Sequence, residues 1–301
     1  MSDAIAVIGS VAFDTLETPH GRADDELGGS ALHFAVAASF FAPVRLLAPV
    51  GADFPEEARG YLAGRGIDLS GLETRPGTTF RWHGRYHQDM NRRDTLHLDL
   101  GVFAGFLPTV TAAVRSTPYV FLGNIDPTLQ GRVLDQFEAP ALVGLDTMNH
   151  WIDAARPALE AILPRVDLLV INDQEAAQLA GEANVVRAAR RILTLGPRTV
   201  LVKRGEYGAI LFSAQSVFAV PAFPLEEVFD PTGAGDTFAG GLIGYLAACG
   251  DRSEKAVRRA IVYGSVLASF VVEDFGGRRM RTLSRDDVER RYRQFVALTE
   301  F

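Results

Sequence analysis

Short apolar runs alternate with segments of helical periodicity along most of the chain. The first run, residues 4–9, is ended by a glycine, and a second run at 44–50 precedes a helical segment at 55–65. Further strands are predicted at 119–125, 141–146, 167–172 and 199–203, and helices at 128–137, 153–163, 184–194, 253–272 and 284–299. Continuous apolar strands separated by helices predict an α/β fold with a doubly wound, mostly parallel sheet flanked by helices.

Residues 78–100 break this alternation. Bulky and polar residues alternate through Thr-Thr-Phe-Arg-Trp-His-Gly-Arg-Tyr-His, and the alternation returns at 95–100 after a polar turn. This period of two predicts a small antiparallel β insertion, and we expect its exposed face to carry Trp82 and Tyr86. The 301 residues suffice for a large core, and one domain with a minor appendage fits this length as well as two domains do. We predict a single domain over 1–301 that contains this insertion.

Composition narrows the possible functions. The formal net charge is -7 and no basic run occurs, which argues against a nucleic-acid partner. The single cysteine, Cys249, supports no disulfide and fits a reducing compartment. The sequence has no long uncharged apolar run and no signal-peptide pattern at its start, so we expect a cytoplasmic protein without a membrane partner.

The string at 230–241 is the strongest candidate for chemistry. Gly233, Ala234 and Gly235 have no bulky side chains and precede an apolar helical segment. Their backbone N–H groups and the start of the helix suit an anion. Asp236 would repel an anion, so its presence indicates a base that takes a proton from an attacking hydroxyl. The alternative is an ordinary helix start in which the acid complements the helix dipole.

Asp-Pro-Thr-Gly-Ala-Gly-Asp-Thr-Phe at 230–238 resembles the C-terminal signature of the ribokinase-like carbohydrate kinases, also called the phosphofructokinase-B family. The resemblance implies an ATP-dependent kinase in which Asp236 is the catalytic base and Gly233, Ala234 and Gly235 form the anion hole. It also makes Asp230 and Thr232 candidates for holding a monovalent cation such as K⁺. Neither a P-loop nor a dinucleotide-binding glycine motif occurs in the chain.

The acceptor side of the predicted site lies in the first forty residues. Asp14 follows the first strand by five residues, which places it at or just beyond the carboxyl end of that strand, where α/β sheets bind ligands. It is equally interpretable as a loop residue capping a turn. Gly28 and Gly29 resemble the family's N-terminal glycine pair, although His33 stands where the family usually has Asn. The resemblance implies that Asp14, Gly28, Gly29 and His33 bind the acceptor; the alternative for His33 is a packed core histidine.

The nucleotide side is implied by two further segments. Asn172 and Glu175 resemble the family's Asn-x-x-Glu motif, which helps to hold Mg²⁺ and the phosphates through water. A strand end followed by a first-turn acid explains the same spacing. Lys203, Gly205 and Gly208 fall in a segment that lines the nucleotide site in the family, and also fit a simple hairpin.

The same resemblance extends to the C-terminal helices and to the insertion. It places Tyr263 and Gly264 near the adenine of ATP. It makes 78–100 a lid that closes over the acceptor, and this lid is our candidate for the contact in a homodimer. The acceptor is a sugar or, alternatively, a nucleoside, whose base would stack on Phe13, Trp82 or Tyr86. A phosphate-sugar sensor without catalysis is a further alternative, against which the intact Asp236 argues.

Overall fold

The computed structural model describes residues 3–300, which form two compact units. The first unit contains the chain up to Phe106 together with the chain from Phe223 onward, and the second unit is Leu107–Ala222. Within residues 3–300 no single helix is long and apolar enough to cross a membrane, although Glu254–Val271 and Phe275–Thr282, which meet at a bend of 104°, together have the required length and composition.

A parallel β-region of the first unit begins at the first predicted strand. Its strands are β1 (Ile5–Ile8), β4 (Val44–Val50), β5 (Ile67–Asp68) and β6 (Leu72–Thr74). β1 lies parallel to β4, with Ile5 opposite Val44, and β4 pairs in parallel with β5 and with β6. β1 is entirely buried, which explains its continuous apolar sequence.

A small four-stranded sheet of the first unit corrects the prediction for the N-terminal region. Its strands, in the order β3-β2-β7-β8, are β2 (Ala12–Thr18), β3 (Gly21–Gly28), β7 (Phe80–Tyr86) and β8 (Arg93–Asp99). The two hairpins are antiparallel and are joined by a parallel pairing of β2 with β7. The predicted insertion is therefore only half of this sheet. The sequence did not reveal β2 and β3 because their buried positions include the carboxyl groups of Asp14 and Glu26.

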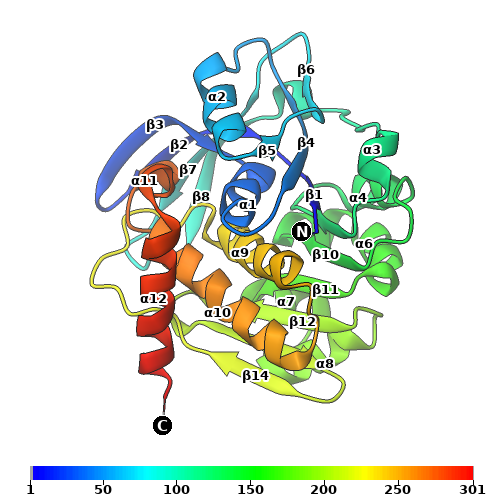
Figure 1. The fold of residues 1–301 in the computed structure, drawn as a ribbon, viewed down its shortest axis with the longest axis vertical. Coiled ribbons are helices and arrows are strands. Elements are labelled where there is room, and N and C mark those ends of the chain that lie inside the picture. The colour runs from blue at the N-terminus through cyan, green and yellow to red at the C-terminus, as the bar shows by residue number, and fades with distance from the viewer. Residues whose placement is uncertain (1–2, 301) are drawn as a thin grey trace. The chain divides into compact units, whose positions relative to one another are not determined.

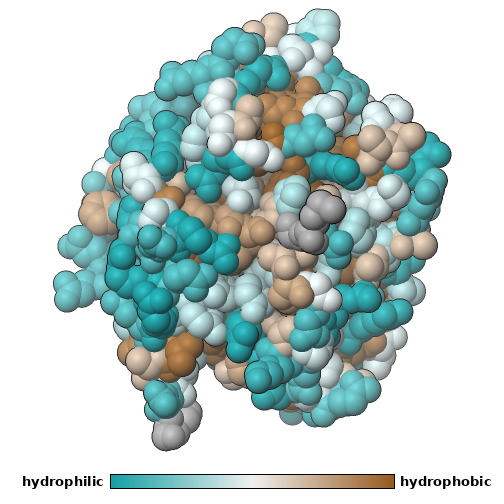
Figure 2. All heavy atoms as spheres, in the orientation of Figure 1, coloured by the Kyte–Doolittle hydropathy of each residue, from teal (hydrophilic) through white to brown (hydrophobic). Residues whose placement is uncertain are grey.

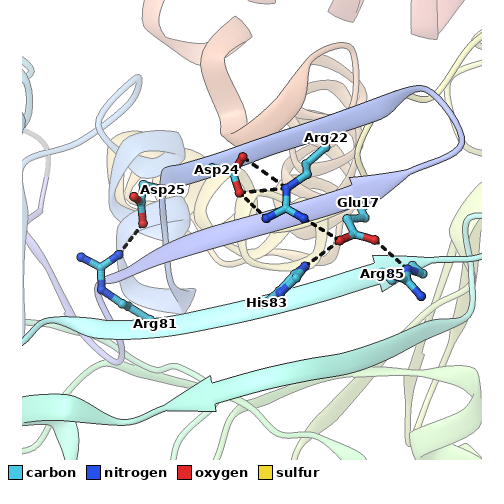
Figure 3. Close-up of polar contacts among 7 residues, drawn as sticks. All are labelled: Glu17, Arg22, Asp24, Asp25, Arg81, His83 and Arg85. Atoms are coloured by element: carbon cyan, nitrogen blue, oxygen red, sulfur yellow. Dashed lines mark hydrogen bonds and ion pairs between the residues drawn. The ribbon is translucent and has the colours of Figure 1, made fainter.

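One face of this small sheet is covered by charged side chains (Figure 3). Glu17 of β2 is at the centre, where its carboxylate accepts hydrogen bonds from Arg22 (2.9 Å) and Arg85 (2.6 Å) and is joined to His83 Nε2 at 3.0 Å. Arg85 is more than half exposed, and exposed ion pairs of this kind contribute little to stability. The network therefore identifies a solvent face, opposite the face that carries Asp14.

Six helices complete the first unit. They are α1 (Ser30–Ala38), α2 (Glu56–Gly64), α9 (Ala234–Cys249), α10 (Glu254–Val271), α11 (Arg278–Thr282) and α12 (Arg285–Leu298), with the 3₁₀ turns η1 (Gly101–Phe103) and η4 (Phe275–Gly277). α1 packs on α9, α9 on α10 and α10 on α12 (Figure 1). α1 is buried throughout, whereas hydrophilic side chains dominate the surface of α12 (Figure 2).

The second unit has the regular alternation that the sequence predicts. Its sheet has the order β9-β10-β11-β12-β13-β14, formed by Tyr119–Leu122, Leu142–Asp146, Leu168–Asn172, Thr199–Lys203, Ala209–Ser213 and Val217–Val220. β9 to β12 are parallel, and β13 and β14 are added antiparallel. The doubly wound, mostly parallel fold class is confirmed.

The helices of this unit differ in detail from the prediction. They are α3 (Ala112–Arg115), α4 (Pro127–Leu134), α5 (Asn149–Ala154), α6 (Arg156–Ile162), α7 (Asp173–Ala180) and α8 (Val185–Leu193), with the 3₁₀ turns η2 (Leu163–Arg165) and η3 (Gly205–Tyr207). The single helix expected at 153–163 is two helices, which meet at Ala155, where φ is -133° and a proline follows two residues later. The helix α7 was not predicted.

Candidate active site

The turn before α9 presents backbone N–H groups at the start of a long helix. Gly233 is the N-cap with φ 72°, a left-handed conformation that glycine adopts without strain. The helix begins at Ala234, so Asp236 lies in its first turn as the sequence predicts. The first N–H groups of a helix have no intrahelical acceptor and carry partial positive charge. The N–H of Ala234 donates to the carbonyl oxygen of Pro231 at 3.2 Å, and the turn places Gly233 and Gly235 close in sequence to the carboxylate of Asp236. Anion binding by this turn stays a prediction.

Asp230 lies before the turn in sequence, and its carboxylate binds two backbone N–H groups. Its Oδ1 accepts the N–H of Thr232 at 2.9 Å and its Oδ2 accepts the N–H of Gly276 at 3.0 Å. The side chain is 1% exposed, and burial raises its pKa despite these two hydrogen bonds. One carboxylate thus joins the turn to the segment that follows α10.

Asp14 and the glycine pair lie together, as predicted. A Cβ atom on Gly28 would lie 1.9 Å from Asp14 Oδ2, and the backbone N–H of Gly29 donates a hydrogen bond to the same carboxyl group. The predicted position at the end of the first strand is wrong, because Asp14 is in the middle of β2 in the small sheet. Glycine at 28 is required by the close approach of the carboxyl group.

The electrostatic environment of Asp14 favours its protonated form. Burial raises its pKa from 3.8 to about 8, and the carboxylates of Asp230 and Asp236 add to the effect. Arg93 and the Gly29 amide oppose the shift. Three carboxyl groups from β2, the turn and α9 are therefore close enough to interact, which brings the predicted acceptor residue near the predicted base.

A hydrogen bond connects the small sheet to the turn. The hydroxyl of Thr232 donates to the phenol oxygen of Tyr86 at 3.0 Å. Tyr86 is 5% exposed, so the prediction that it lies on an exposed face is wrong. It is buried because its side chain lies on the same face of the sheet as Asp14 and reaches the turn.

Trp82 and Arg93 cover the same face of the small sheet. The Trp82 ring lies over Gly84, where a Cβ atom would be 2.1 Å from the ring, and its Nε1 donates to Thr95 Oγ1 at 3.1 Å. The Arg93 guanidinium lies 5.6 Å from the centroid of the Trp82 ring. Trp82 is half-buried rather than exposed, and it pairs across the strands with Asp14. No pattern in the sequence indicated that Arg93 belongs to this group.

A second contact that the sequence did not predict joins α11 to strand β3 of the small sheet. Arg278, at the start of α11, donates a hydrogen bond from Nε to Glu26 Oε1 at 3.0 Å, and Glu26 lies opposite Asp14 in the pairing of β2 with β3. Glu26 is 7% exposed. The two residues are far apart in sequence, so no local pattern indicated the pair.

His33 lies against the anion turn. A Cβ atom on Gly233 would be 2.4 Å from the Cδ2 atom of His33, and one on Gly277 would be 3.5 Å from its Cε1 atom. The side chain is 5% exposed, and burial lowers its pKa from 6.5 to about 4. Contact with the acceptor stays a prediction for this residue.

In the second unit, the predicted Mg²⁺ motif forms a capping box. Asn172 is the N-cap of α7 and its Oδ1 accepts the N–H of Glu175 at 2.8 Å, while Glu175 Oε2 accepts the N–H of Asn172 at 2.9 Å. The interpretation as a strand end followed by a first-turn acid is therefore correct, and the Mg²⁺ role stays a prediction. Within residues 3–300, no group of three or more His, Cys, Asp or Glu side chains is placed to hold a metal directly. Coordination of Mg²⁺ by Glu175 through water is compatible with this arrangement.

Lys203 and the glycines after it form the hairpin between β12 and β13. Lys203 Nζ lies 3.6 Å from Asp146 Oδ2, at the ends of β12 and β10. Gly205 and Gly208 have positive φ, and a Cβ atom on Gly208 would be 2.0 Å from the carbonyl oxygen of Val220. The hairpin interpretation is correct, and the nucleotide-binding role of this segment stays a prediction.

Tyr263 and Gly264 lie inside the first unit on α10. The ring of Tyr263 stacks with those of Tyr245 and Tyr292, with centroids 4.6 Å and 4.3 Å away, and its hydroxyl donates to Glu289 at 2.9 Å. Gly264 packs on the backbone of Phe238. The stack gives Tyr263 a structural role, and its proximity to adenine stays a prediction.

An α/β fold with a small accessory sheet, and a glycine turn followed by an acid at a helix start, define the ribokinase-like kinases as a class. The match with the model for the pfkB family of carbohydrate kinases covers residues 4–282, and the chain belongs to that family. The protein is accordingly an ATP-dependent kinase of the family that contains sugar kinases and nucleoside kinases.

Several relatives agree with this assignment. The chain is 32% identical to a cytidine kinase of Thermococcus kodakarensis over 248 residues. This match covers 80% of this chain and 88% of the relative. It is 28% identical over 259 residues to a nucleoside kinase of Methanothermobacter thermautotrophicus, covering 83% and 79% of the two chains. A protein of Escherichia coli assigned as ribokinase II, solved in complex with ATP and Mg²⁺, has a TM-score of 0.78 at 20% identity over 97% of this chain and 99% of the other.

Proposed function

We propose that the protein transfers the γ-phosphoryl group of ATP to a primary hydroxyl of a sugar or a sugar-containing acceptor. The observation that carries the proposal is the position of Asp236, in the first turn of α9 and directly after the turn of Gly233, Ala234 and Gly235. An anion site alone has no use for a carboxylate, whereas a kinase needs a base beside its phosphoryl-binding donors.

The roles of the groups follow from this position. The hydroxyl oxygen of the acceptor forms a bond to the γ-phosphorus, and the bond between the γ-phosphorus and the ADP oxygen breaks. Asp236 accepts the proton that this hydroxyl loses. The N–H groups of residues 233–235 stabilise the charge on the phosphoryl oxygens during this step. Glu175 would help to hold, through water, the Mg²⁺ that accompanies ATP, and this ion would supply charge neutralisation for the phosphates. The proton leaves the site from Asp236 after the phosphorylated product departs.

Asp14 is the proposed anchor for the acceptor. Two hydroxyls of a vicinal diol can donate to one carboxylate, which would direct the remaining primary hydroxyl toward Asp236. Such donors stabilise the ionised form, so binding of the acceptor lowers the raised pKa of Asp14 and releases a proton near neutral pH. The affinity for the acceptor then increases with pH up to about 8.

A nucleoside is the second candidate acceptor, and the Trp82 ring favours it. The ring lies over Gly84, and Trp82 is opposite Asp14 in the strand register and on the same face of the sheet. A planar aromatic surface beside a ribose-binding carboxyl group is suited to stacking with a base. The cytidine and nucleoside kinases among the relatives support the same class.

A homodimer through the small sheet is proposed from its edge strand. β8 is at the edge of the sheet, and its Leu96 and Leu98 are 42% and 53% exposed. An edge strand that exposes two leucines is a ready contact for a second copy of the chain. Light scattering should give the mass of two chains, and a Leu98→Lys variant should give the mass of one; a single-chain mass for the unaltered protein would contradict the proposal.

The test of the catalytic assignment is Asp236→Asn. The amide keeps the start of α9 but cannot take the proton, so kcat should fall by about 10²–10⁴-fold while ATP binding, measured by calorimetry, stays nearly unchanged. Asp286→Asn, which removes an exposed carboxylate of α12, is the matched control and should leave kcat unchanged. Phosphorylation is measured on a panel of sugars and nucleosides. Near-normal turnover of Asp236→Asn with any acceptor would refute the role of Asp236.

A further inference from the structure

The imidazole ring of His33 is enclosed by two glycines from different loops. A Cβ atom on Gly233, the N-cap of α9, would lie 2.4–2.6 Å from three atoms of the ring. A Cβ atom on Gly277, the N-cap of α11, would lie 3.5–3.6 Å from two of them. Both glycines have left-handed backbone, with φ of 72° and 67°. The ring therefore fills the space that a side chain on Gly233 would occupy, and it lies within van der Waals distance of Gly277.

The helix that carries His33 gives the ring a rigid base. Every residue of α1 is buried, and α1 packs along α9, whose first turn contains Asp236. Burial keeps the ring uncharged near neutral pH, because it lowers the pKa of His33 to about 4. An uncharged ring packs against a glycine turn without adding a cation to the acid cluster at Asp14, Asp230 and Asp236.

A small cavity adjoins the ring. It has a volume of about 20 Å³, and His33 and Thr237 are among the residues that line it. Within residues 3–300, His33 Nε2 and Thr237 Oγ1 are both buried and have no hydrogen-bond partner. A cavity of this size accommodates one water molecule, which satisfies two polar atoms on its wall. Thr237 follows Asp236 directly in α9, and its N–H donates to the Gly233 carbonyl at 2.8 Å.

We propose that His33 is a positioning residue for phosphoryl transfer: its ring supports the turn at Gly233, and a water in the adjoining cavity joins its Nε2 to the hydroxyl of Thr237. This inference rests on the proposed function, because the turn that His33 supports is the proposed anion hole. An asparagine at this position would have two fewer heavy atoms and would not fill the space between the glycines. His33 thus acts on the phosphoryl side of the reaction rather than through a contact with the acceptor.

Steady-state kinetics of His33→Ala test the proposal. Loss of the ring frees Gly233, so kcat should fall roughly ten- to a hundredfold, because small misplacement of reacting groups is costly, while the acceptor KM changes less than about threefold. Added imidazole, which fits the vacated space, should restore part of kcat. Phe34→Leu is the matched control, because Phe34 is buried on the same helix but is not among the residues that line the cavity. It should leave kcat nearly unchanged and should show no response to imidazole.

The possible outcomes separate the proposal from its alternatives. A large rise in the acceptor KM at unchanged kcat would overturn it and make His33 an acceptor contact. Equal losses in His33→Ala and Phe34→Leu, without rescue, would reduce His33 to a packing residue. Asp236→Asn with normal turnover would remove the proposed function, whereas His33→Ala with normal kcat would remove only this inference.

A measurement on the unaltered protein covers the case in which His33→Ala does not fold. The ring ¹⁵N resonances of His33 should stay in the uncharged pattern between about pH 5 and about pH 9, as the lowered pKa requires. They should shift when ADP with aluminium fluoride, a mimic of the transferring phosphoryl group, is bound together with an acceptor. They should change little with the acceptor alone. A shift with the acceptor alone, equal to that in the full complex, would contradict the proposal.

Discussion

The buried carboxyl group of Asp14 should make the stability of the protein fall as pH rises. Burial and the neighbouring carboxylates of Asp230 and Asp236 raise its pKa from 3.8 to about 8. Asp14→Asn keeps the shape of the side chain and removes its titration. The difference in stability between the two proteins therefore isolates the cost of ionising Asp14 in the folded state.

The sign and size of the effect follow from proton linkage. Between pH 3.8 and about 8 the folded protein keeps a proton that the unfolded chain has released. Stability must decrease with increasing pH throughout this interval, because the folded state binds more protons than the unfolded state. Each pH unit costs about 1.4 kcal/mol. From about pH 5 to about pH 8 the loss amounts to about 4 kcal/mol, a large fraction of the stability of an ordinary domain.

Urea unfolding at several pH values measures this dependence. We expect the free energy of unfolding of Asp14→Asn to exceed that of the unaltered protein by an amount that grows with pH up to about 8 and then levels off. Asp286→Asn controls for the loss of one exposed negative charge and should follow the unaltered protein.

A pH-independent difference would refute the reasoning. It would mean that Asp14 is already ionised in the folded protein at pH 5, and that Arg93 or solvent compensates the two neighbouring carboxylates. If the stability of the unaltered protein relative to Asp14→Asn increased with pH, the meaning would be the same, because such an increase requires a lowered pKa for Asp14.

Three further predictions concern the turn and the acceptor. Gly28→Ala should raise the acceptor KM, because its Cβ would lie 1.9 Å from Asp14 Oδ2 and the carboxyl group must turn away; an unchanged KM would contradict this. Tyr86→Phe removes the hydrogen bond from Thr232 and should lower the free energy of unfolding by about 1 kcal/mol in urea titration, whereas no loss would show that the bond adds nothing. Gly235→Val should reduce kcat, because the side chain would crowd the transferring phosphoryl group and displace it from one N–H donor. Loss of one such contact raises the barrier by about 3 kcal/mol, which single-turnover kinetics measures. Full activity would mean that the turn is only a helix cap.

Several features follow from the sequence alone because they depend on local chemistry. The apolar strands of the second unit are buried in a parallel sheet, and burial on both faces requires continuous hydrophobic residues. The turn at Gly233 and the start of α9 were predicted from small residues followed by an apolar helix. Asn172 and Glu175 were also interpretable locally, because a capping box is formed by residues three positions apart.

Only the tertiary structure decided how distant segments meet. The strands β2 and β3 were missed because Asp14 and Glu26 occupy buried positions, which a hydrophobic pattern represents as solvent-exposed. Their burial depends on partners supplied elsewhere in the chain. Arg278, which binds Glu26, follows it by 252 residues, and no sequence period extends over such a distance.

The same reason explains the correction at Tyr86 and the surroundings of His33, which the sequence did not predict. The alternation in β7 fixes which side chains share a face, but it does not show that this face meets the turn at Thr232 and buries Tyr86. The histidine at 33 occupies a position that resembles a family motif, yet its surroundings are set by the packing of α1 on α9 and by the backbone of Gly233. Periodicity determines the side of an element that is buried, whereas the residues that cover it depend on contacts between elements far apart in the sequence.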